Sequence, residues 1–293
     1  MNFPIINKQI LAPNIKRLDV EAPGIARRVK PGQFVMVTLD ERSEKIPLSV
    51  VEANIQRGTI ALIIQEVGPS TIRLGALQIK DEIASILGPL GLPATIEKVG
   101  VVVCIASGIG ATRILPICRA FKQKKNKVVG IMGAKTKKEL VLEAQVRLSC
   151  HKIFITTDDG SYVRRGSETD LLKEFLDGEK VDLVYAAGSL DMMRGVCHLT
   201  RDKGIRTLVN LSPVMVDGLG LCGSCRVKVA GEQVLACVDG PEFDGHRVDF
   251  DDLGIRINAF KDIEQCLSRP FLPFPKRNEP KILTRFLKGI LKK

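Results

Sequence analysis

The feature that most constrains the fold is a change in hydrophobic patterning near Val99. Before it, residues 1–97 carry short β-type runs such as QFVMVTL, PLSVVEA and TIALIIQEV, separated by Gly-, Pro- and Asn-containing turns. After it, short apolar runs alternate with helix-length amphipathic stretches, beginning with VGVVVCIA and GIGATRILPICRAFKQK. Such alternation is typical of βαβ units in a parallel, doubly wound sheet. The sequence therefore predicts a small antiparallel β-barrel followed by an α/β domain.

Composition divides the chain further, and 293 residues are enough for more than one domain. A Gly- and Pro-rich linker runs from Gly88 to about Lys98, and from about Leu211 glycines and three cysteines replace the βα alternation. After Cys266, the segment RPFLPFPKRNEP contains four prolines, which exclude a regular helix or a central strand. We expect four segments: a barrel of residues 1–97, an α/β domain of 98–210, a small lobe of 211–266, and a tether with a basic amphipathic tail helix at 267–293.

The charge distribution excludes some partners. The net charge is +11, and +6 of it lies after Pro270, where apolar residues follow one face of the predicted tail helix. With no Trp and two Tyr, the chain lacks a base-stacking platform, so nucleic acid is not an expected partner. The tail is expected to dock on another subunit, with a membrane surface or a solvated tail as alternatives. Because no long apolar run or secretory signal occurs, we expect a soluble, cytoplasmic protein.

The strongest chemical signal is Asp217-Gly-Leu-Gly-Leu-Cys222-Gly-Ser-Cys225, followed later by Cys237. Plant-type [2Fe-2S] loops have the spacing Cys-x4-Cys-x2-Cys and a distant fourth Cys. Asp217 stands where the first Cys would be, and the loop glycines permit left-handed turns that aim amides at the cluster. We favour a [2Fe-2S] cluster held by these four residues. A zinc site, structural cysteines without metal, and Asp217 as a plain turn residue are the alternatives.

A nucleotide site is indicated by VVVCIASGIGATRILP, which is typical of a strand, a glycine-bearing turn and a helix. Phosphate groups bind at the helix N-terminus in such units. Gly108 and Gly110 would allow close approach of the backbone, and Arg113 would add a phosphate contact. The motif alone does not establish nucleotide binding, because ordinary strand-turn-helix units have the same pattern.

The order of barrel, nucleotide sheet and cysteine-rich lobe resembles the ferredoxin-NADP reductase-like superfamily. More closely, roughly residues 5–255 resemble the electron-transfer subunit of dihydroorotate dehydrogenase B and its relatives, the small subunit of NADH-dependent ferredoxin:NADP oxidoreductase and the sulfide dehydrogenase flavin subunit. The segment VMVDGLGLCGSCRVKV together with the later LACVDGPEFDGHRVDFDDL, which bring one Asp and three Cys to the motif, is most similar to the ferredoxin:NADP oxidoreductase subunit. Four Cys are the rule in the dihydroorotate enzyme. The resemblance implies FAD, a [2Fe-2S] cluster and NAD(H) or NADP(H) as cofactors.

Site residues follow from this resemblance. The family's Pro-Leu/Ile-Ser/Thr flavin strand is matched by Pro47-Leu48-Ser49, and the Ser49 hydroxyl is the catalytic candidate, since it could donate a hydrogen bond to flavin N5. The basic residue before the motif is matched by Lys45. On the residues alone, IPLSV is a strand and GPST is a turn. The implied FAD contacts are Lys45, Ile46, Pro47, Leu48, Ser49, Ile63, Ile64, Gln65, Gly68, Ser70 and Thr71.

The implied nicotinamide contacts depart in part from the family pattern. Ala106 and Ser107 replace two glycines, and Thr112-Arg113 replaces Ala-Pro. Three lysines after VVGIMGA do not decide between NADH and NADPH, because a lysine run is also typical of a solvated face. The predicted NAD contacts are Gly108, Ile109, Gly110, Thr112, Arg113, Asp158, Ala187, Gly188 and Met192.

The resemblance implies an electron-transfer subunit of an oxidoreductase. It would pass electrons between NAD(P)H, FAD and the cluster, to or from a larger oxidoreductase subunit, with ferredoxin as a further partner and electron bifurcation left open. No hydrolase triad or paired-carboxylate site emerges from the sequence, so the final substrate chemistry is expected in the partner. The alternatives are a dihydroorotate dehydrogenase subunit, a stand-alone ferredoxin reductase and a non-enzymatic iron-sulfur binding module.

Overall fold

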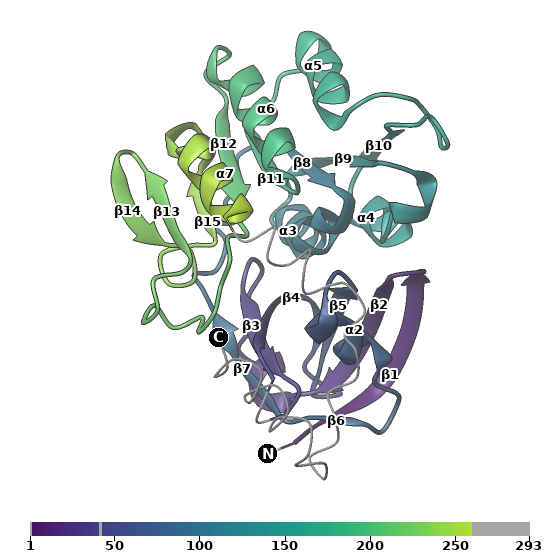
Figure 1. The fold of residues 1–293 in the computed structure, drawn as a ribbon. Coiled ribbons are helices and arrows are strands. Elements are labelled where there is room, and N and C mark those ends of the chain that lie inside the picture. Colours follow the sequence, from purple (N-terminus) through teal and green to yellow (C-terminus); the bar gives the residue numbers. More distant parts are fainter. Residues whose placement is uncertain (1, 41–42, 260–293) are drawn as a thin grey trace, which may run out of the picture. The chain divides into compact units, whose positions relative to one another are not determined.

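The amino-terminal segment forms a seven-stranded antiparallel sheet (Figure 1). This computed structural model describes residues 2–40 and 43–259, so the predicted tether and tail helix at 267–293 lie outside the described residues. The strand order is β6-β1-β2-β5-β4-β3-β7. The bounds are β1 (Phe3–Ala12), β2 (Ile15–Glu21), β3 (Phe34–Thr38), β4 (Lys45–Asn54), β5 (Thr59–Gln65), β6 (Glu82–Ile83) and β7 (Ser85–Leu90), with the helices α1 (Pro23–Ala26) and α2 (Pro69–Ala76).

The sheet curls around its own apolar core, which confirms the predicted barrel. Leu18, Val35, Leu62 and Ile64 are fully buried in this core. Side chains of a strand alternate between the two faces of its sheet, so one face of each strand packs inward while the other meets solvent or the second sheet. Ile63 of β5 accordingly points the other way and joins the core that underlies the α/β sheet.

The second segment is the predicted doubly wound sheet. Five parallel strands have the order β10-β9-β8-β11-β12. They are β8 (Val101–Ser107), β9 (Lys127–Ala134), β10 (Lys152–Thr157), β11 (Leu183–Ala187) and β12 (Arg206–Asn210). Buried on both faces, they consist of near-continuous apolar runs, as parallel strands require.

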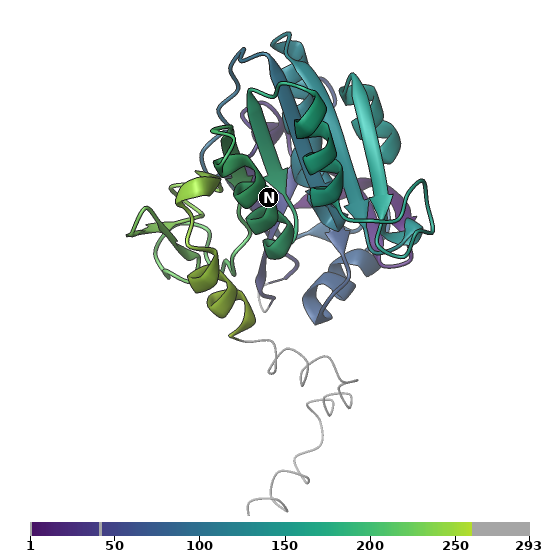
Figure 2. The same ribbon diagram turned by 90° about the horizontal axis from the view of Figure 1, so that it is seen from above.

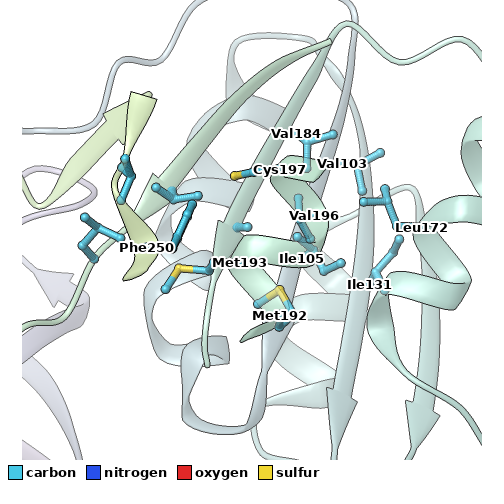
Figure 3. Packing of buried hydrophobic residues seen from close by; sticks show 14 of the residues in the cluster. Val103, Ile105, Ile131, Leu172, Val184, Met192, Met193, Val196, Cys197 and Phe250 are labelled. Carbon is cyan, nitrogen blue, oxygen red and sulfur yellow. The ribbon is translucent and has the colours of Figure 1, made fainter. Parts of the chain in front are cut away.

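Helices cover both faces of this sheet (Figure 2). The helices α3 (Ala111–Gln123) and α4 (Glu143–Ser149) pack on one face, and α5 (Glu168–Gly178) and α6 (Leu190–Arg201) pack on the other. Figure 3 shows Met192, Val196 and Cys197 of α6 in one buried cluster with Val103, Ile105 and Val184 of the strands. Short 3-10 turns occur at η1 (Gly108–Gly110), η2 (Lys137–Glu139) and η3 (Gly245–Arg247).

The cysteine-bearing segment is joined to the same sheet. It contains the hairpin β13 (Arg226–Val229) and β14 (Glu232–Leu235), then β15 (Glu242–Asp244) and α7 (Phe250–Asn258). β15 pairs antiparallel with β12 and becomes the edge of the sheet. Residues through Asn258 form one unit by their contacts. Within the part of the chain that the structure describes, every helix is too short or too polar to span a lipid bilayer.

Candidate functional site

One crevice is lined by residues from all three predicted segments. Its core residues are Ser49 of β4, Arg113 of α3 and Asn210 at the end of β12, which also line an adjoining pocket. The remaining residues of the crevice are Phe34, Pro47, Leu211, Ser212, Met215 and Pro241. The adjoining pocket adds Gly32, Gln33, Val50 and Pro116. The barrel, the nucleotide sheet and the cysteine-bearing segment therefore meet at one place.

Strand alternation presents the predicted flavin strand to this crevice. Ser49 pairs with Phe34 and Pro47 pairs with Met36 across β3 and β4. Because Pro47 and Ser49 are two residues apart, they lie on the same face of the strand, and both line the crevice. Ile46 is buried in the barrel core instead, and Leu48 packs against that core. Lys45 is exposed where β4 begins. Of the predicted strand motif, Pro47 and Ser49 are the two residues that reach the crevice.

The second predicted flavin segment leads into the N-terminus of α2. Ile64 lies in the barrel core, and Gln65 is half-buried at the end of β5. The Thr71 hydroxyl accepts hydrogen bonds from the amides of Val67 and Gly68, at 3.0 Å each. A side chain at Gly68 would meet no atom within 4 Å, so the backbone there is approachable. This helix end suits an anionic phosphate chemically, because it offers amides and the positive end of the helix.

At that helix end, the Ser70 hydroxyl donates to the Glu44 carboxylate at 2.9 Å. A phosphate oxygen that used this hydroxyl would have to displace Glu44. The predicted contact of Ser70 with FAD phosphate therefore requires a local side-chain rearrangement.

The predicted nucleotide turn lies where the loops after β8 and β11 touch. A Cβ at Gly110 would lie 2.0 Å from the carbonyl oxygen of Ala187, and one at Gly188 would lie 2.1 Å from Ser107 Oγ. The Ser189 amide donates to Ser107 Oγ at 2.7 Å. The strand order reverses between β8 and β11, which is where doubly wound sheets bind dinucleotides.

The Ser107 hydroxyl holds the two loops of this turn together. Sequence reasoning did not give it a role, because the bond joins residues far apart in the chain. Gly108 has a φ of +51° and open space around it. Thr112 donates to the carbonyl of Ile109 at 2.8 Å, and Met192 is buried beneath Gly188.

Arg113 and Asp158, both predicted to contact the nucleotide, have different surroundings. Arg113 Nη1 donates to the carbonyl oxygen of Asn210 at 3.1 Å, so its side chain lies in the crevice beside Ser49. Burial lowers the pKa of Arg113 from 12.5 to about 10. Asp158 is exposed after β10, and its amide donates to the carbonyl of Ala134 at 3.1 Å. Asp158 is not among the residues that line the crevice.

The loop from Asp217 to Cys225 has the expected left-handed turns. Gly218, Gly220 and Gly223 have φ values of +73°, +83° and +66°. The Asp217 carboxylate accepts hydrogen bonds from four backbone amides: Leu219 at 2.7 Å, Gly220 at 3.2 Å, Leu221 at 3.1 Å and Cys222 at 2.6 Å. These bonds lower the pKa of Asp217. In this structure the amides that were expected to face a cluster face the Asp217 carboxylate.

The three nearby cysteines differ in their environments. Cys225 and Cys237 are buried with adjacent thiols, whereas Cys222 is exposed and lies 3.1 Å from Ser224 Oγ. Burial and the neighbouring Cys225 raise the pKa of Cys237 to about 12, and the Ser224 hydroxyl lowers the pKa of Cys222. Within residues 2–40 and 43–259, no three such side chains are gathered in a metal-binding arrangement. The donor set of thiols and one carboxylate on a glycine-rich loop nevertheless suits iron.

Sequence reasoning missed part of the crevice. Phe34, Asn210 and Met215 line it, but none of them was assigned a role: Phe34 lies in the run QFVMVTL and Met215 in the segment VMVDGLGLCGSCRVKV, and no motif includes Asn210. Asn210 ends β12, and its Nδ2 donates to the buried Tyr185 hydroxyl at 3.3 Å. Only the folded chain shows that these positions belong to the site.

Comparison with known proteins agrees with this architecture. Residues 212–249 match the iron-sulfur cluster binding domain of dihydroorotate dehydrogenase B. The chain is 34% identical to the dihydroorotate dehydrogenase B (NAD(+)) electron transfer subunit homolog of Thermotoga maritima, covering 92% of this chain and 95% of the relative. It is 39% identical to an uncharacterized protein of Clostridium beijerinckii encoded in the adh 3' region, covering 89% and 92%. A solved chain of NADH-dependent reduced ferredoxin-NADP oxidoreductase superposes with a TM-score of 0.85 at 33% identity, covering 97% of each chain.

A barrel and a doubly wound sheet that share a crevice, with an iron-sulfur domain after them, define the class of ferredoxin reductase-like oxidoreductase subunits. Within this class, the chain belongs to the family of dihydroorotate dehydrogenase B electron-transfer subunits. The predicted superfamily, fold and electron-transfer class are thereby confirmed.

Proposed function

We propose that this chain carries electrons between a nicotinamide dinucleotide, FAD and one [2Fe-2S] cluster, and exchanges them with a larger oxidoreductase subunit. The observation that carries the proposal is the crevice to which the barrel, the sheet and the cysteine-bearing segment all contribute residues. Groups held by the three segments would lie near one another there. In this proposal the barrel of residues 1–97 holds FAD, residues 98–210 hold the nucleotide, and the lobe of 211–266 holds the cluster.

The barrel residues have distinct roles in this proposal. Ser49 offers a hydroxyl to the flavin ring in the crevice, while Lys45 and the α2 N-terminus serve the phosphates. When bound, FAD supplies the centre that takes up a hydride and releases electrons singly. The fit rests on two observations, the crevice beside Pro47 and Ser49 and the open approach to Gly68.

The sheet and the lobe complete the proposed path. Gly110 and Gly188 bring two backbone loops into contact, and Gly108 leaves open space beside them, where a nucleotide, NAD(H) or NADP(H), would lie. Cys222, Cys225 and Cys237 would hold the cluster with Asp217 as the fourth ligand. For this, the Asp217 carboxylate would have to give up some of its four amide bonds.

The partner is proposed from the relatives. The Thermotoga relative is named as an electron transfer subunit, which supports a larger catalytic subunit for this chain. The single Asp and three Cys favour a ferredoxin:NADP oxidoreductase-type complex, with ferredoxin as a further partner. A dihydroorotate dehydrogenase subunit is the second candidate, because several relatives bear that name. A cytoplasmic location is proposed on the seven free thiols of the described residues, which suit a reducing compartment.

The test is an anaerobic absorption and EPR experiment on the purified chain before and after NADH addition. We expect flavin bands that bleach and a [2Fe-2S] signal that appears on reduction. Ser49→Ala should keep FAD but slow its reduction by NADH, about 10-fold or more. A cluster without flavin or NADH response would instead support the non-enzymatic binding module, and a colourless zinc-loaded chain would overturn the proposal.

A further inference from the structure

Arg113 is a crevice cation without a carboxylate partner among the described residues. Its one described hydrogen bond runs from Nη1 to the Asn210 carbonyl, although a guanidinium has five N–H donors. It lies in the first turn of α3, which contains no acidic residue and where the helix dipole already favours negative charge. Arg119 of the same helix, in contrast, is paired with Glu52 at 2.7 Å.

Glu242 is a buried carboxylate of the neighbouring region, but no described hydrogen bond joins it to Arg113. Glu242 accepts a hydrogen bond from the Thr95 amide at 3.2 Å and interacts with Arg206 and Tyr185. The Tyr185 hydroxyl accepts from Asn210 Nδ2. No carboxylate among the described residues compensates the guanidinium of Arg113, even though burial disfavours its charged form. An anion in the crevice would supply the missing partner.

The position of Arg113 identifies the kind of anion. Both pockets that Arg113 lines are also lined by Ser49. Under the proposed function, Ser49 lies at the flavin ring. Hydride uptake brings two electrons and one proton to a neutral ring, so the ring gains one negative charge while the nicotinamide becomes a cation. A fixed cation near a developing negative charge stabilises the charged state.

We propose that Arg113 raises the reduction potential of the flavin by compensating the negative charge that the ring gains on reduction. This inference rests on the proposed function. It gives Arg113 a role other than the phosphate contact that its place after the glycine turn predicts. Arg113 thus serves the flavin and not the nucleotide phosphate for which the sequence pattern suggested it.

The test is an anaerobic redox titration of the flavin in the full chain with no nicotinamide present. Arg113→Met should shift the ratio of reduced to oxidised flavin at a given potential 10- to 100-fold toward the oxidised form. For a two-electron couple this is a lower potential by about 30 mV per tenfold change. Arg113→Lys should restore most of the shift because it keeps the charge. The matched control, Arg119→Met on the same helix, should titrate like the wild type.

Two results would overturn the inference while leaving the proposed function intact. One is an Arg113→Met variant whose flavin keeps the wild-type reduction potential while its NADH binding is weaker. This result would show that Arg113 contacts the nucleotide phosphate. The other is a marked loss of thermal stability in flavin-free Arg113→Met, which would indicate a structural role. We expect no such loss, because the variant removes a charge that has no carboxylate partner. A wild-type chain that binds no flavin would contradict both proposals.

Discussion

At the residue scale, the Asp217 carboxylate has two roles to be separated, that of a loop cap and that of a cluster ligand. It holds four amides of its own loop, and it is also the proposed fourth ligand. We expect Asp217→Cys to retain the cluster with an altered EPR signal, because thiolate is a softer ligand than carboxylate. Asp217→Ala should lose most of its iron, since it removes both the ligand and the loop cap. Iron and sulfide content per chain, measured together with EPR spectra, tests whether Asp217 is a cluster ligand. An unchanged EPR spectrum in Asp217→Ala would show that the residue only caps the loop.

Glu242 gives a prediction about pH at the same scale. Burial raises the pKa of this carboxyl above its usual 4.5, and its Oε2 has no hydrogen-bond partner among the described residues. Between the unfolded and folded pKa values the folded chain binds the extra proton, so the free energy of unfolding decreases as pH rises through that window. Glu242→Gln removes this dependence.

Urea unfolding at pH 5 and pH 7.5 tests the Glu242 prediction. The stability of Glu242→Gln relative to the wild type should be more favourable at the higher pH. Glu232→Gln, on the exposed hairpin strand β14, is the control and should show no such trend. An equal effect of Glu242→Gln at both pH values would mean that its carboxyl does not titrate differently on folding.

At the element scale, the contact between the loops after β8 and β11 depends on glycine. A Cβ at Gly110 would lie 2.0 Å from a backbone carbonyl, and backbone cannot yield as a flexible side chain does. We expect Gly110→Ala to separate the two loops, weaken NADH binding at least 10-fold and destabilise the fold by about 1–3 kcal/mol. Gly178→Ala, where a Cβ meets nothing within 4 Å, is the matched control. Calorimetric titration with NADH measures the affinity, and a Gly110→Ala chain of wild-type affinity would remove the nucleotide from this turn.

At the scale of the whole molecule, the pairing of β15 with β12 ties the cysteine-bearing lobe to the nucleotide sheet. A short lobe with little core of its own depends on its metal for order. We expect chelation of the iron to speed amide exchange in β15 and β12, while β9 and β10 keep their protection. Hydrogen-exchange mass spectrometry of the loaded and depleted chain measures this difference. Equal exchange in both samples would mean that the lobe is ordered without iron.

Much of the architecture could be read from the chain because its signals are local. Alternating β-type runs predicted the barrel, the βα alternation after Val99 predicted the parallel sheet, and the Asp217 to Cys225 spacing predicted the iron-sulfur domain. Each signal resides in a few neighbouring residues, where periodicity and side-chain chemistry act directly. The family resemblance added the predicted flavin-binding strand, of which Pro47 and Ser49 reach the crevice.

The tertiary structure decided how these parts meet. Arg113 is separated from its Asn210 partner by 97 positions, so no local pattern shows that its side chain turns toward Ser49. The edge strand β15 is too short to be predicted from periodicity, and it forms because β12 offers an open edge. The amino-acid sequence by itself determined the types of element and indicated the iron-sulfur chemistry, since both depend on neighbouring residues. The shared crevice and the charge within it depend on contacts between distant segments, which exist only once the chain has folded.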